Sequence, residues 1–389
     1  MNKRVSLLGA TGSIGDSTLK VIDAFPDRFQ LQLMVAGRSW RKMLSLVKKY
    51  RPVSVAMFDP DSAEHLRKEL SGLPVKVYAG EQGIIQAIQE TPVDITVSAI
   101  VGAAGLQPTM AAIHMKSDVA LANKEALVIA GVFVKEAARK MNVQILPVDS
   151  EHNAIHQCLR GGRRAEVRRI VLTASGGPFR TCKGDLSLIT PQQALKHPTW
   201  KMGPKITIDS STMMNKGLEV IEAYHLFDCE KEQIEAVIHP QSIVHSMVEF
   251  LDGSILAQMG VTSMTHPVQY ALSYPDRMES PFGYLDFTQT LDLHFEAIDR
   301  ERFPCIELAC IALEKPTVWP CVLNAANEVA VEAFLGGAIK YTAIPEIIKN
   351  AMNAFEHSNV IHLEHVLELD KAARNHARSL INQFTKDAL

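Results

Sequence analysis

Three carboxylates in the chain have the residue types and spacing of a metal site. Asp149 and Glu151 are separated by one residue and follow an apolar run that ends at Val148. We expect that run to be a strand, in which residues i and i+2 share a face. Glu219 ends a later Met-Met-Asn-Lys-Gly-Leu-Glu stretch. Three carboxylates suit a hard ion such as Mg²⁺ or Mn²⁺, although helix caps and ordinary surface carboxylates are the alternative.

Hydroxyl, amide and ammonium groups gather in two segments that could bind a phosphate monoester. Ser175 begins a Ser-Gly-Gly-Pro loop after an apolar run, and Ser210 lies in Asp-Ser-Ser-Thr, which we also place after a strand. Asn215 and Lys216 follow closely. Free backbone N–H groups in such loops add donors for phosphate oxygens. His245 lies farther along; taken alone, such a histidine is more often structural than catalytic.

A loop between these two segments is a candidate lid. Residues 196–204 read Lys-His-Pro-Thr-Trp-Lys-Met-Gly-Pro, and they contain His197 and an isolated Trp200. Two prolines and a glycine favour a loop that closes over a bound ligand. Packing of Trp200 in a core is the alternative.

The first residues of the chain contain a candidate nucleotide site. Residues 5–8, Val-Ser-Leu-Leu, lead directly into Gly-Ala-Thr-Gly-Ser-Ile-Gly at 9–15, and a helical pattern follows. Glycines let the backbone approach a pyrophosphate, and a helix N-terminus supplies free N–H groups and positive dipole. The spacing is G-x-x-G-x-x-G rather than the commoner G-x-G-x-x-G. Dinucleotide binding is our interpretation, with a purely structural turn as the alternative.

The end of the second expected strand selects between NAD(H) and NADP(H). An NAD site would carry Asp or Glu there for the ribose 2′-hydroxyl. This chain has Ala-Gly-Arg-Ser at 36–39. The Arg38 guanidinium and a hydroxyl can hold a 2′-phosphate, which a carboxylate would repel. The sequence therefore predicts NADP(H), with an exposed arginine in a loop as the alternative.

Alternating strand and helix patterns over residues 4–148 position these groups. The expected strands are short, rich in β-branched residues and bounded by Gly, Pro or Asp. They cover residues 5–8, 31–36, 53–57, 75–78, 95–99, 119–122 and 144–148. Such alternation predicts an α/β fold with a Rossmann-like, doubly wound parallel sheet.

The remaining chain predicts two further domains. Strand patterns at 170–174, 236–238 and 243–250 indicate a central α/β catalytic domain, and helical periodicity from Ile306 onward indicates a C-terminal helical bundle. The predicted division is a nucleotide-binding domain at 1–148, a catalytic domain at 149–285, a linker at 286–305 and the helical domain at 306–389. A chain of 389 residues has room for two or three domains at roughly 150 residues each.

Charge and composition exclude several classes of function. Lys and Arg number 40 against 43 Asp and Glu, so bulk electrostatics predict neither nucleic-acid nor membrane binding. The longest apolar run, residues 126–134, falls short of the roughly 20 residues that span a membrane. The six cysteines form no C-x-x-C pair, and structure is expected directly after residue 4. These features predict a cytoplasmic protein with reduced thiols.

A local cluster of arginines has two interpretations. It is a solvated segment before a strand, or it binds phosphate. Its members are Arg160, Arg163, Arg164, Arg168 and Arg169.

Taken together, these segments resemble the 1-deoxy-D-xylulose 5-phosphate reductoisomerase family. The matching stretches follow the family order: GATGSIG (9–15), ANKEA (122–126), PVDSEHNAI (147–155), TASGGPF (173–179), KHPTWKMG (196–203), IDSSTMMNKGLE (208–219), HPQSIVHSM (239–247) and LNAANE (323–328). The DSEHN and MMNKGLE motifs are far more specific than the glycine loop.

The resemblance implies a fold, an activity and partners. The fold is a V-shaped homodimer with an NADPH domain, a central catalytic domain and a C-terminal helical bundle. The activity is the rearrangement and NADPH-dependent reduction of 1-deoxy-D-xylulose 5-phosphate to 2-C-methyl-D-erythritol 4-phosphate, a step of the non-mevalonate isoprenoid precursor pathway. It implies one Mg²⁺ or Mn²⁺ ion per subunit, a small phosphorylated sugar as substrate, and no nucleic-acid or membrane partner.

The resemblance also assigns individual residues. The metal ligands are Asp149, Glu151 and Glu219, which act in catalysis together with Lys124. The substrate-binding residues are Lys124, Ser150, Glu151, Ser175, His197, Ser210, Asn215, Lys216, Glu219 and His245. The cofactor-binding residues are Thr11, Gly12, Ser13, Ile14, Gly37, Arg38, Ser39, Asn123, Glu125 and Gly203. Trp200 and Met202 belong to the closing loop.

One stretch departs from the family pattern. Many members have Asp-Met-Arg-x-Pro where this chain has Ser-Met-Thr-His-Pro at 263–267. Both charged residues are absent together, which suits the loss of a structural ion pair. The departure concerns local packing or the dimer contact, and it leaves the metal and phosphate residues intact.

Two other functions compete with this interpretation. An NADP-dependent semialdehyde dehydrogenase can share the glycine loop, but it needs a nucleophilic cysteine. A non-catalytic NADP-sensing regulator would keep Arg38 and the glycine loop, with no reason to keep the carboxylates and the phosphate-binding residues together.

Overall fold

The structure, a computed structural model, describes residues 2–200 and 202–386 and consists of two compact units. The first takes Met1–Ala126, Val134–Asn153 and Ser263–Tyr284. The second takes Leu127–Phe133, Ala154–Thr262 and Leu285–Leu389. The sequence-based division at 148, 285 and 305 stays a prediction.

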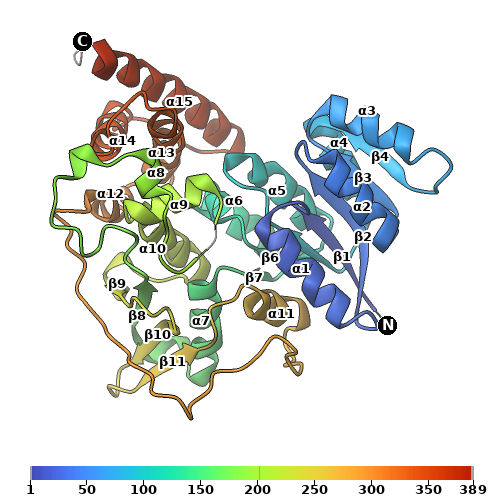
Figure 1. The fold of residues 1–389 in the computed structure, drawn as a ribbon, viewed down its shortest axis with the longest axis horizontal. Helices are drawn as coiled ribbons and strands as arrows, with labels where there is room; N and C mark the ends of the chain where they lie inside the picture. Colours follow the sequence, from blue (N-terminus) through green and yellow to red (C-terminus); the bar gives the residue numbers. More distant parts are fainter. Residues whose placement is uncertain (1, 201, 387–389) are drawn as a thin grey trace. The chain divides into compact units, whose positions relative to one another are not determined.

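A seven-stranded parallel sheet forms the centre of the first unit (Figure 1). Its strands are β1 (Lys3–Leu8), β2 (Phe29–Ala36), β3 (Ser54–Met57), β4 (Lys76–Ala79), β5 (Ile95–Ser98), β6 (Asp118–Leu121) and β7 (Ile145–Pro147). The order β4-β3-β2-β1-β5-β6-β7 confirms the doubly wound α/β fold. The direction of winding reverses between β1 and β5, where such sheets bind nucleotides at the carboxyl ends of the strands.

Helices cover both faces of this sheet. They are α1 (Ser13–Ala24), α2 (Trp40–Tyr50), α3 (Pro60–Glu69), α4 (Gly80–Glu90) and α5 (Leu106–His114). Both ends of α6 (Lys124–Met141) belong to the first unit and its middle to the second, while α7 (Ser150–Cys158) begins in the first unit and ends in the second. Right-handed crossovers place α1–α3 on one face and α4 and α5 on the other. In α1 the predicted periodic positions Thr18, Leu19 and Ile22 are buried.

The segment that departs from the family pattern returns to this first unit. There α11 (Thr265–Ser273) packs against α1, and Val268, Ala271 and Leu272 join the core of the sheet. At the start of α11, the Oγ of Ser263 and the Oγ1 of Thr265 lie 2.7 Å apart, within hydrogen-bonding distance. Two hydroxyl groups therefore pair where the family pattern has two opposite charges.

A four-stranded mixed sheet forms part of the second unit. Its strands β8 (Val167–Ala174), β9 (Ile234–Ile238), β10 (Val244–Phe250) and β11 (Ile255–Met259) lie in the order β11-β10-β8-β9. The pair β8–β9 is parallel, and β10 is antiparallel to both neighbours. Three of these strands were predicted. The short edge strand β11, much of it exposed, lacks the buried apolar pattern that identifies a strand in sequence.

The sequence prediction was wrong at the segment before Ser210. Lys-Ile-Thr-Ile suggested a strand, but Pro204–Ser211 form helix α9. Pro204 occupies the first turn, where its fixed φ favours a helix and its missing N–H costs nothing. The following helix α10 (Met214–Phe227) packs on β8 and β9. Ser210 therefore lies at the end of a helix and not beyond a strand.

The helical C-terminal region is confirmed. It comprises α12 (Pro304–Ala312), α13 (Trp319–Leu335), α14 (Ala343–Ala354) and α15 (Leu363–Lys386). Most of α13 is buried, because α9, α12, α14 and α15 all pack against it. The remaining short helix of the unit, α8 (Pro191–Ala194), precedes the predicted lid.

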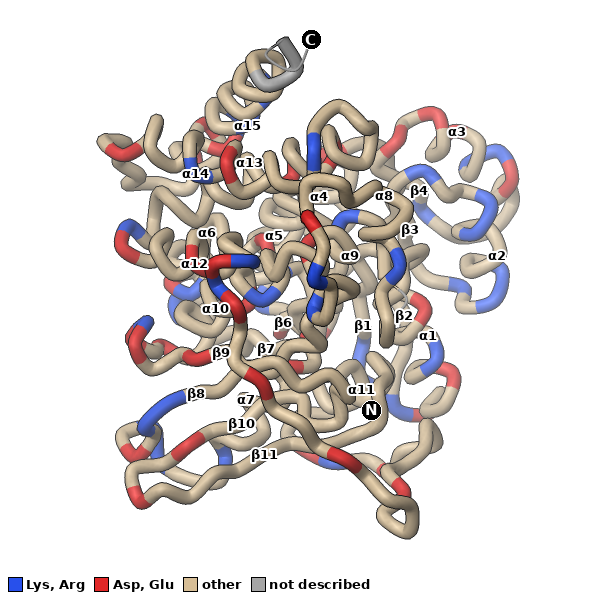
Figure 2. The backbone as a smooth tube through the Cα atoms, turned by 60° about the vertical axis from the view of Figure 1, so that its left-hand side comes forward, with Lys and Arg blue, Asp and Glu red and all other residues tan. Residues whose placement is uncertain are grey.

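The arginine cluster forms ion pairs. Arg168 pairs with Glu249, Arg169 with Glu235 and Glu249, and Arg163 with Glu166. Figure 2 shows this mixture of basic and acidic positions along β8 and β10. The pairing favours a structural role over phosphate binding. Among the described helices, none is long and apolar enough to cross a membrane.

Candidate functional site

The glycine loop of the first unit has a backbone that other residues could not adopt. Gly9 has φ +98°, and a Cβ there would lie 2.4 Å from the carbonyl oxygen of Ala99. A Cβ on Gly15 would lie 2.6 Å from the carbonyl oxygen of Gly9. These contacts let α1 begin close against β1 and β5. Gly9 and Gly15 are therefore required for the turn itself.

The N-terminus of α1 is open to solvent at the predicted pyrophosphate position. Gly12 and Ser13 are exposed, and no side chain caps the helix. Lys42, from α2, donates to the carbonyl oxygen of Thr11 at 3.1 Å and to Asp16 at 2.7 Å. Its ammonium group offsets the negative charge of Asp16 beside the loop. Sequence reasoning missed Lys42, because a contact between two successive strand–helix units leaves no local pattern.

Arg38 lies where the sequence predicts the 2′-phosphate. Its side chain is 88% exposed, and its Nε lies 3.8 Å from the Oδ1 of Asp59. Ser62 donates to Asp59 from its backbone N–H and its hydroxyl, and these bonds hold the pKa of the Asp59 carboxyl below its usual range. The guanidinium is accessible and oriented by a charged neighbour. Asp59 was also missed, although it follows β3 as Arg38 follows β2.

Asn123 and Glu125 are fixed by the start of α6. The Oδ1 of Asn123 accepts the N–H of Ala126 at 3.1 Å, which caps the helix. Its Nδ2 donates to the Oε2 of Glu125 and to the carbonyl oxygen of Gly102, both at 3.0 Å. Both side chains are buried. The predicted pair therefore forms one rigid polar group in the first unit.

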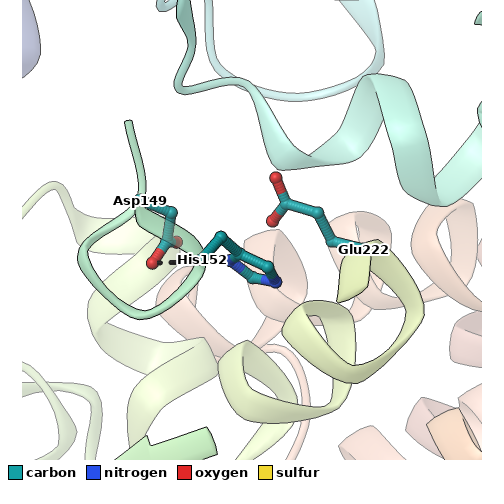
Figure 3. Close-up of side chains that lie close together, drawn as sticks. All are labelled: Asp149, His152 and Glu222. Carbon is teal, nitrogen blue, oxygen red and sulfur yellow. Dashed lines mark ion pairs between the residues drawn. The ribbon is translucent and has the colours of Figure 1, made fainter. Parts of the chain in front are cut away.

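Lys124 and the first two predicted metal ligands lie together in the first unit. The Nζ of Lys124 is 3.0 Å from the Oδ2 of Asp149, and the lysine side chain is only 6% exposed. Ser150 donates to the Oε2 of Glu151 at 2.5 Å. Figure 3 shows His152 beside Asp149, with its Nδ1 3.8 Å from the Oδ1. Two carboxylates, an ammonium and a hydroxyl are thus brought together.

The reason given from sequence for the pairing of Asp149 with Glu151 was wrong. They do not share the face of an extended strand, because β7 ends at Pro147 and α7 begins at Ser150. Instead, the backbone N–H of Glu151 donates to the Oδ1 of Asp149 at 3.3 Å. The two carboxylates are brought near one another by the start of a helix.

The third predicted metal ligand belongs to the second unit. Glu219 is almost fully buried on α10. Its Oε1 accepts from the Nδ2 of Asn215 at 2.6 Å, and its Oε2 is paired with the Nζ of Lys216. Spacings of three and four residues place these side chains on one helix face. Figure 3 also draws Glu222, which lies on the same helix and is equally buried.

His197 joins the two serines of the predicted phosphate site. Its Nε2 lies 3.1 Å from the Oγ of both Ser175 and Ser210. Its Nδ1 accepts the backbone N–H groups of Thr199 at 3.1 Å and Trp200 at 2.9 Å. Because those groups can only donate, Nδ1 holds no proton and the neutral ring carries its hydrogen on Nε2. Burial also lowers the pKa of His197, which favours this neutral form.

The remaining predicted residues of this unit are His245 and members of the candidate lid. His245 is buried in β10, and its carbonyl oxygen accepts from the Oγ1 of Thr173 at 2.7 Å. Gly203 is exposed before α9, while Trp200 and Met202 are half-buried. Lys201 lies outside the described residues.

Five of the six cysteines do not support the semialdehyde dehydrogenase alternative. Burial raises the pKa of the Cys158 thiol to about 11 and that of Cys305 to about 12. A nucleophilic cysteine needs the opposite shift. Burial raises the pKa values of Cys229, Cys310 and Cys321 as well.

Two combinations of described side chains supply ligand types that divalent cations take. One is Asp149, Glu151 and Glu219, and the other is Asp149, His152 and Glu222. The first offers carboxylate oxygens alone, which suits Mg²⁺ or Mn²⁺. The donor chemistry of the predicted triad therefore fits a hard divalent ion.

The fold and these groups define a class: an α/β enzyme with a doubly wound, dinucleotide-binding sheet, followed along the chain by clustered carboxylates and by a hydrogen-bonded group of hydroxyls and an imidazole. The sequence model of the 1-deoxy-D-xylulose 5-phosphate reductoisomerase family matches residues 5–131. Two sequence models of the C-terminal domains of this family match residues 145–227 and 259–376. The chain belongs to the 1-deoxy-D-xylulose 5-phosphate reductoisomerase family.

Individual members of the family are similar to this chain over nearly its whole length. The reductoisomerase of Heliobacterium modesticaldum is 50% identical over 98% of both chains. That of Chlorobaculum tepidum is 49% identical over 97% of this chain and 100% of its own. The Zymomonas mobilis enzyme, solved with NADPH, has a TM-score of 0.91 at 43% identity, covering 98% of this chain and 99% of that one. A reductoisomerase solved with NADPH, fosmidomycin and magnesium has a TM-score of 0.92 at 40% identity, covering 98% of both.

Proposed function

We propose that this chain rearranges and reduces 1-deoxy-D-xylulose 5-phosphate to 2-C-methyl-D-erythritol 4-phosphate, using NADPH and a divalent metal ion. The observation that carries the proposal is the joining of Ser175 and Ser210 by the neutral ring of His197. Asn215 and Lys216 begin the next helix in the same unit. Together these groups supply the donors that a phosphate monoester needs.

The phosphate group takes no part in the chemistry, so its binding is available for positioning. Ser175, His197, Ser210, Asn215 and Lys216 would hold it. Binding energy from a remote group can be used to orient the reacting carbons and to order the 196–203 loop over them. Trp200 and Met202 of that loop are half-buried in the structure, and we propose that they close over the substrate.

Asp149, Glu151 and Glu219 would hold one Mg²⁺ or Mn²⁺ ion per subunit. Such an ion supplies Lewis acidity toward the substrate carbonyl and its neighbouring hydroxyl. Lys124, 3.0 Å from Asp149, adds positive charge for the oxygen on which negative charge develops. The Ser150 hydroxyl is positioned by Glu151 to donate or accept at the same oxygens. His245 would line the substrate pocket.

The cofactor would bind at the glycine loop and the ends of β1 and β2. Thr11, Gly12, Ser13 and Ile14 would hold the pyrophosphate, and residues 37–39 would hold the 2′-phosphate. Asn123, Glu125 and Gly203 would lie by the nicotinamide. The rigid Asn123–Glu125 pair would orient the ring for hydride transfer to the aldehyde that the rearrangement produces.

We further propose a cytoplasmic homodimer. In the second unit, one face of the four-stranded sheet packs on α10, while alternate residues face the other way. That other face holds a cavity of 170 Å³ lined by side chains including Met247, Ile255 and Phe295, and the last two are about half exposed. A second copy would cover this face. Sedimentation should give a dimer, and Ile255→Asp should shift it toward monomer.

The test of the activity is NADPH oxidation with purified protein and 1-deoxy-D-xylulose 5-phosphate. We expect oxidation with Mg²⁺ or Mn²⁺, none with excess EDTA, and recovery when the metal is restored. Oxidation without metal that a thiol alkylator abolishes would support the semialdehyde dehydrogenase instead. NADPH binding without any turnover would support the regulator.

A further inference from the structure

Helix α9 contains a buried carboxylate directly before the phosphate-binding Ser210. The side chain of Asp209 is 1% exposed. A carboxylate taken out of water is costly unless charged or hydrogen-bonding groups surround it. Neither the proposed metal chemistry nor phosphate binding uses Asp209, so its burial needs a separate explanation.

Two groups compensate the Asp209 carboxylate. Lys205, one turn earlier in α9, places its Nζ 2.8 Å from the Oδ2. Asn327, at the centre of α13, donates from its Nδ2 to the Oδ1 at 2.8 Å, and it is fully buried. This second bond joins two residues 118 positions apart. It ties the helix of Ser210 to the C-terminal helical region.

A further hydrogen bond holds Ser211, the residue that follows Ser210. The hydroxyl of Tyr341 donates to the carbonyl oxygen of Ser211 at 2.5 Å. Burial raises the pKa of Tyr341, so this hydroxyl stays protonated and remains a donor. The ring of Tyr341 makes edge-to-face contacts with two phenylalanine rings. The distance between ring centroids is 5.7 Å to Phe334 of α13 and 5.5 Å to Phe179.

Phe179 extends this tie to the other phosphate-binding serine. It ends the Ser-Gly-Gly-Pro-Phe loop that begins at Ser175. In that loop Gly177 packs on Ser210 so closely that a Cβ would lie 2.6 Å from the Ser210 carbonyl oxygen. Tyr341 therefore contacts both of the segments whose hydroxyls His197 joins.

We propose that Asn327 and Tyr341 are positioning residues for phosphate recognition. Asn327, in α13, and Tyr341, in the connection between α13 and α14, hold the end of α9 at the residues before and after Ser210. They thereby fix the Ser210 hydroxyl relative to Ser175 and His197. This role rests on the proposed phosphate site. Through this role the C-terminal helical region would affect substrate affinity without contacting the substrate itself.

The test compares Asn327→Ala and Tyr341→Phe with a matched control in α13. Asn324→Ala removes an equally buried asparagine whose Nδ2 donates to Glu328 of the same helix. We expect the first two variants to raise the KM for the phosphorylated substrate and the inhibition constant of inorganic phosphate by the same factor, about tenfold. Their kcat and KM for NADPH should change less than about twofold, and the control should match the parent.

The outcomes separate positioning from general stability. Unchanged KM and phosphate inhibition in both variants would overturn the proposal, as would an equal change in the Asn324→Ala control or in the KM for NADPH. Tyr341→Phe keeps the buried ring, so it remains decisive if Asn327→Ala does not fold. Calorimetric titration with inorganic phosphate gives an independent readout. If the parent binds phosphate but does not turn over 1-deoxy-D-xylulose 5-phosphate, the proposed reaction fails while the positioning of phosphate is still tested.

Discussion

The phosphate end proposed in the second unit and the nucleotide end proposed in the first unit are built in opposite ways. In the second unit, the side chains proposed to bind phosphate are buried or half-buried, and His197 joins Ser175 to Ser210 by hydrogen bonds. In the first unit, the nucleotide end relies on glycines and a helix N-terminus, and Arg38 is 88% exposed. One end would recognise its ligand by side chains held in place by hydrogen bonds, and the other by backbone shape and one accessible charge.

This contrast predicts how mutations distribute. Removing a partner from a buried polar network leaves another group unsatisfied and is costly, whereas an exposed charge can change with little effect on stability. Substitutions at the buried end should therefore affect turnover and substrate affinity strongly. Substitutions at the exposed end should change cofactor choice and little else.

The largest effect is expected at Glu219. Glu219→Gln keeps the size of the side chain but removes the charge that a divalent ion needs, and it replaces one of the two oxygens that accept from Asn215 and Lys216 with an NH2 group. Turnover should fall by more than the roughly 10–100-fold typical of groups that only orient metal ligands, while NADPH affinity stays unchanged. Steady-state kinetics with a Mg²⁺ titration and NADPH fluorescence measure both. Glu232→Gln, at an exposed position, is the control, and turnover of Glu219→Gln near the parent rate would refute the metal role.

A smaller and selective effect is expected at Arg38. Arg38→Asp places a negative charge where the 2′-phosphate is proposed to bind, so the preference for NADPH over NADH should fall by at least about tenfold. The kcat/KM ratio for the two cofactors measures it. Arg41→Asp, three residues along on α2, controls for the charge change alone. An unchanged preference in Arg38→Asp would remove the basis for assigning NADP(H).

His197 should show its effect through pH. The pKa of this histidine is lowered from 6.5 in the folded protein, so the unfolded chain takes up a proton first as pH falls. The contribution of His197 to stability is therefore present above pH 6.5 and is lost as pH falls through the folded pKa. Nitrogen-15 NMR of the imidazole should show the Nε2–H tautomer at neutral pH and a midpoint below 6.5. A proton on Nδ1 at neutral pH would contradict the assignment.

The smallest effect is expected outside both ends, at the hydroxyl pair that begins α11. Ser263→Ala removes the 2.7 Å bond to Thr265, which should lower the free energy of unfolding by about 1 kcal/mol. Turnover and cofactor preference should not change. Urea denaturation and the activity assay measure the two quantities. A loss of turnover in the folded variant would place this segment in the function after all.

Sequence patterns predicted the architecture because local periodicity reports it. All seven strands of the parallel sheet and the C-terminal helices were recognised from apolar spacing. Where a short pattern was ambiguous, prediction failed: Ile206 and Ile208 alternate as in a strand, yet Pro204 begins a helix there. The prediction that Asp149 and Glu151 share the face of a strand was wrong for the same kind of reason, because a helix begins at Ser150.

Motifs indicated the site residues but not the contacts that hold them. Lys42 at Thr11 and Asn327 at Asp209 join segments distant in sequence. No periodicity or motif links such pairs, because their proximity is set by the packing of whole elements. The predicted residues can therefore be named from sequence, while the groups that position them require the structure.

The reaction proposed for this chain rearranges the carbon skeleton of the substrate as well as reducing the substrate. The direct measurement is carbon-13 NMR of the product formed from 1-deoxy-D-xylulose 5-phosphate labelled at its two adjacent hydroxyl-bearing carbons, with NADPH and Mg²⁺. We predict that the one-bond coupling between the labelled carbons disappears, because the bond that joins them breaks and a branched product forms. A reduced product that keeps this coupling would show that the chain is a simple dehydrogenase, which does not break the bond between these carbons.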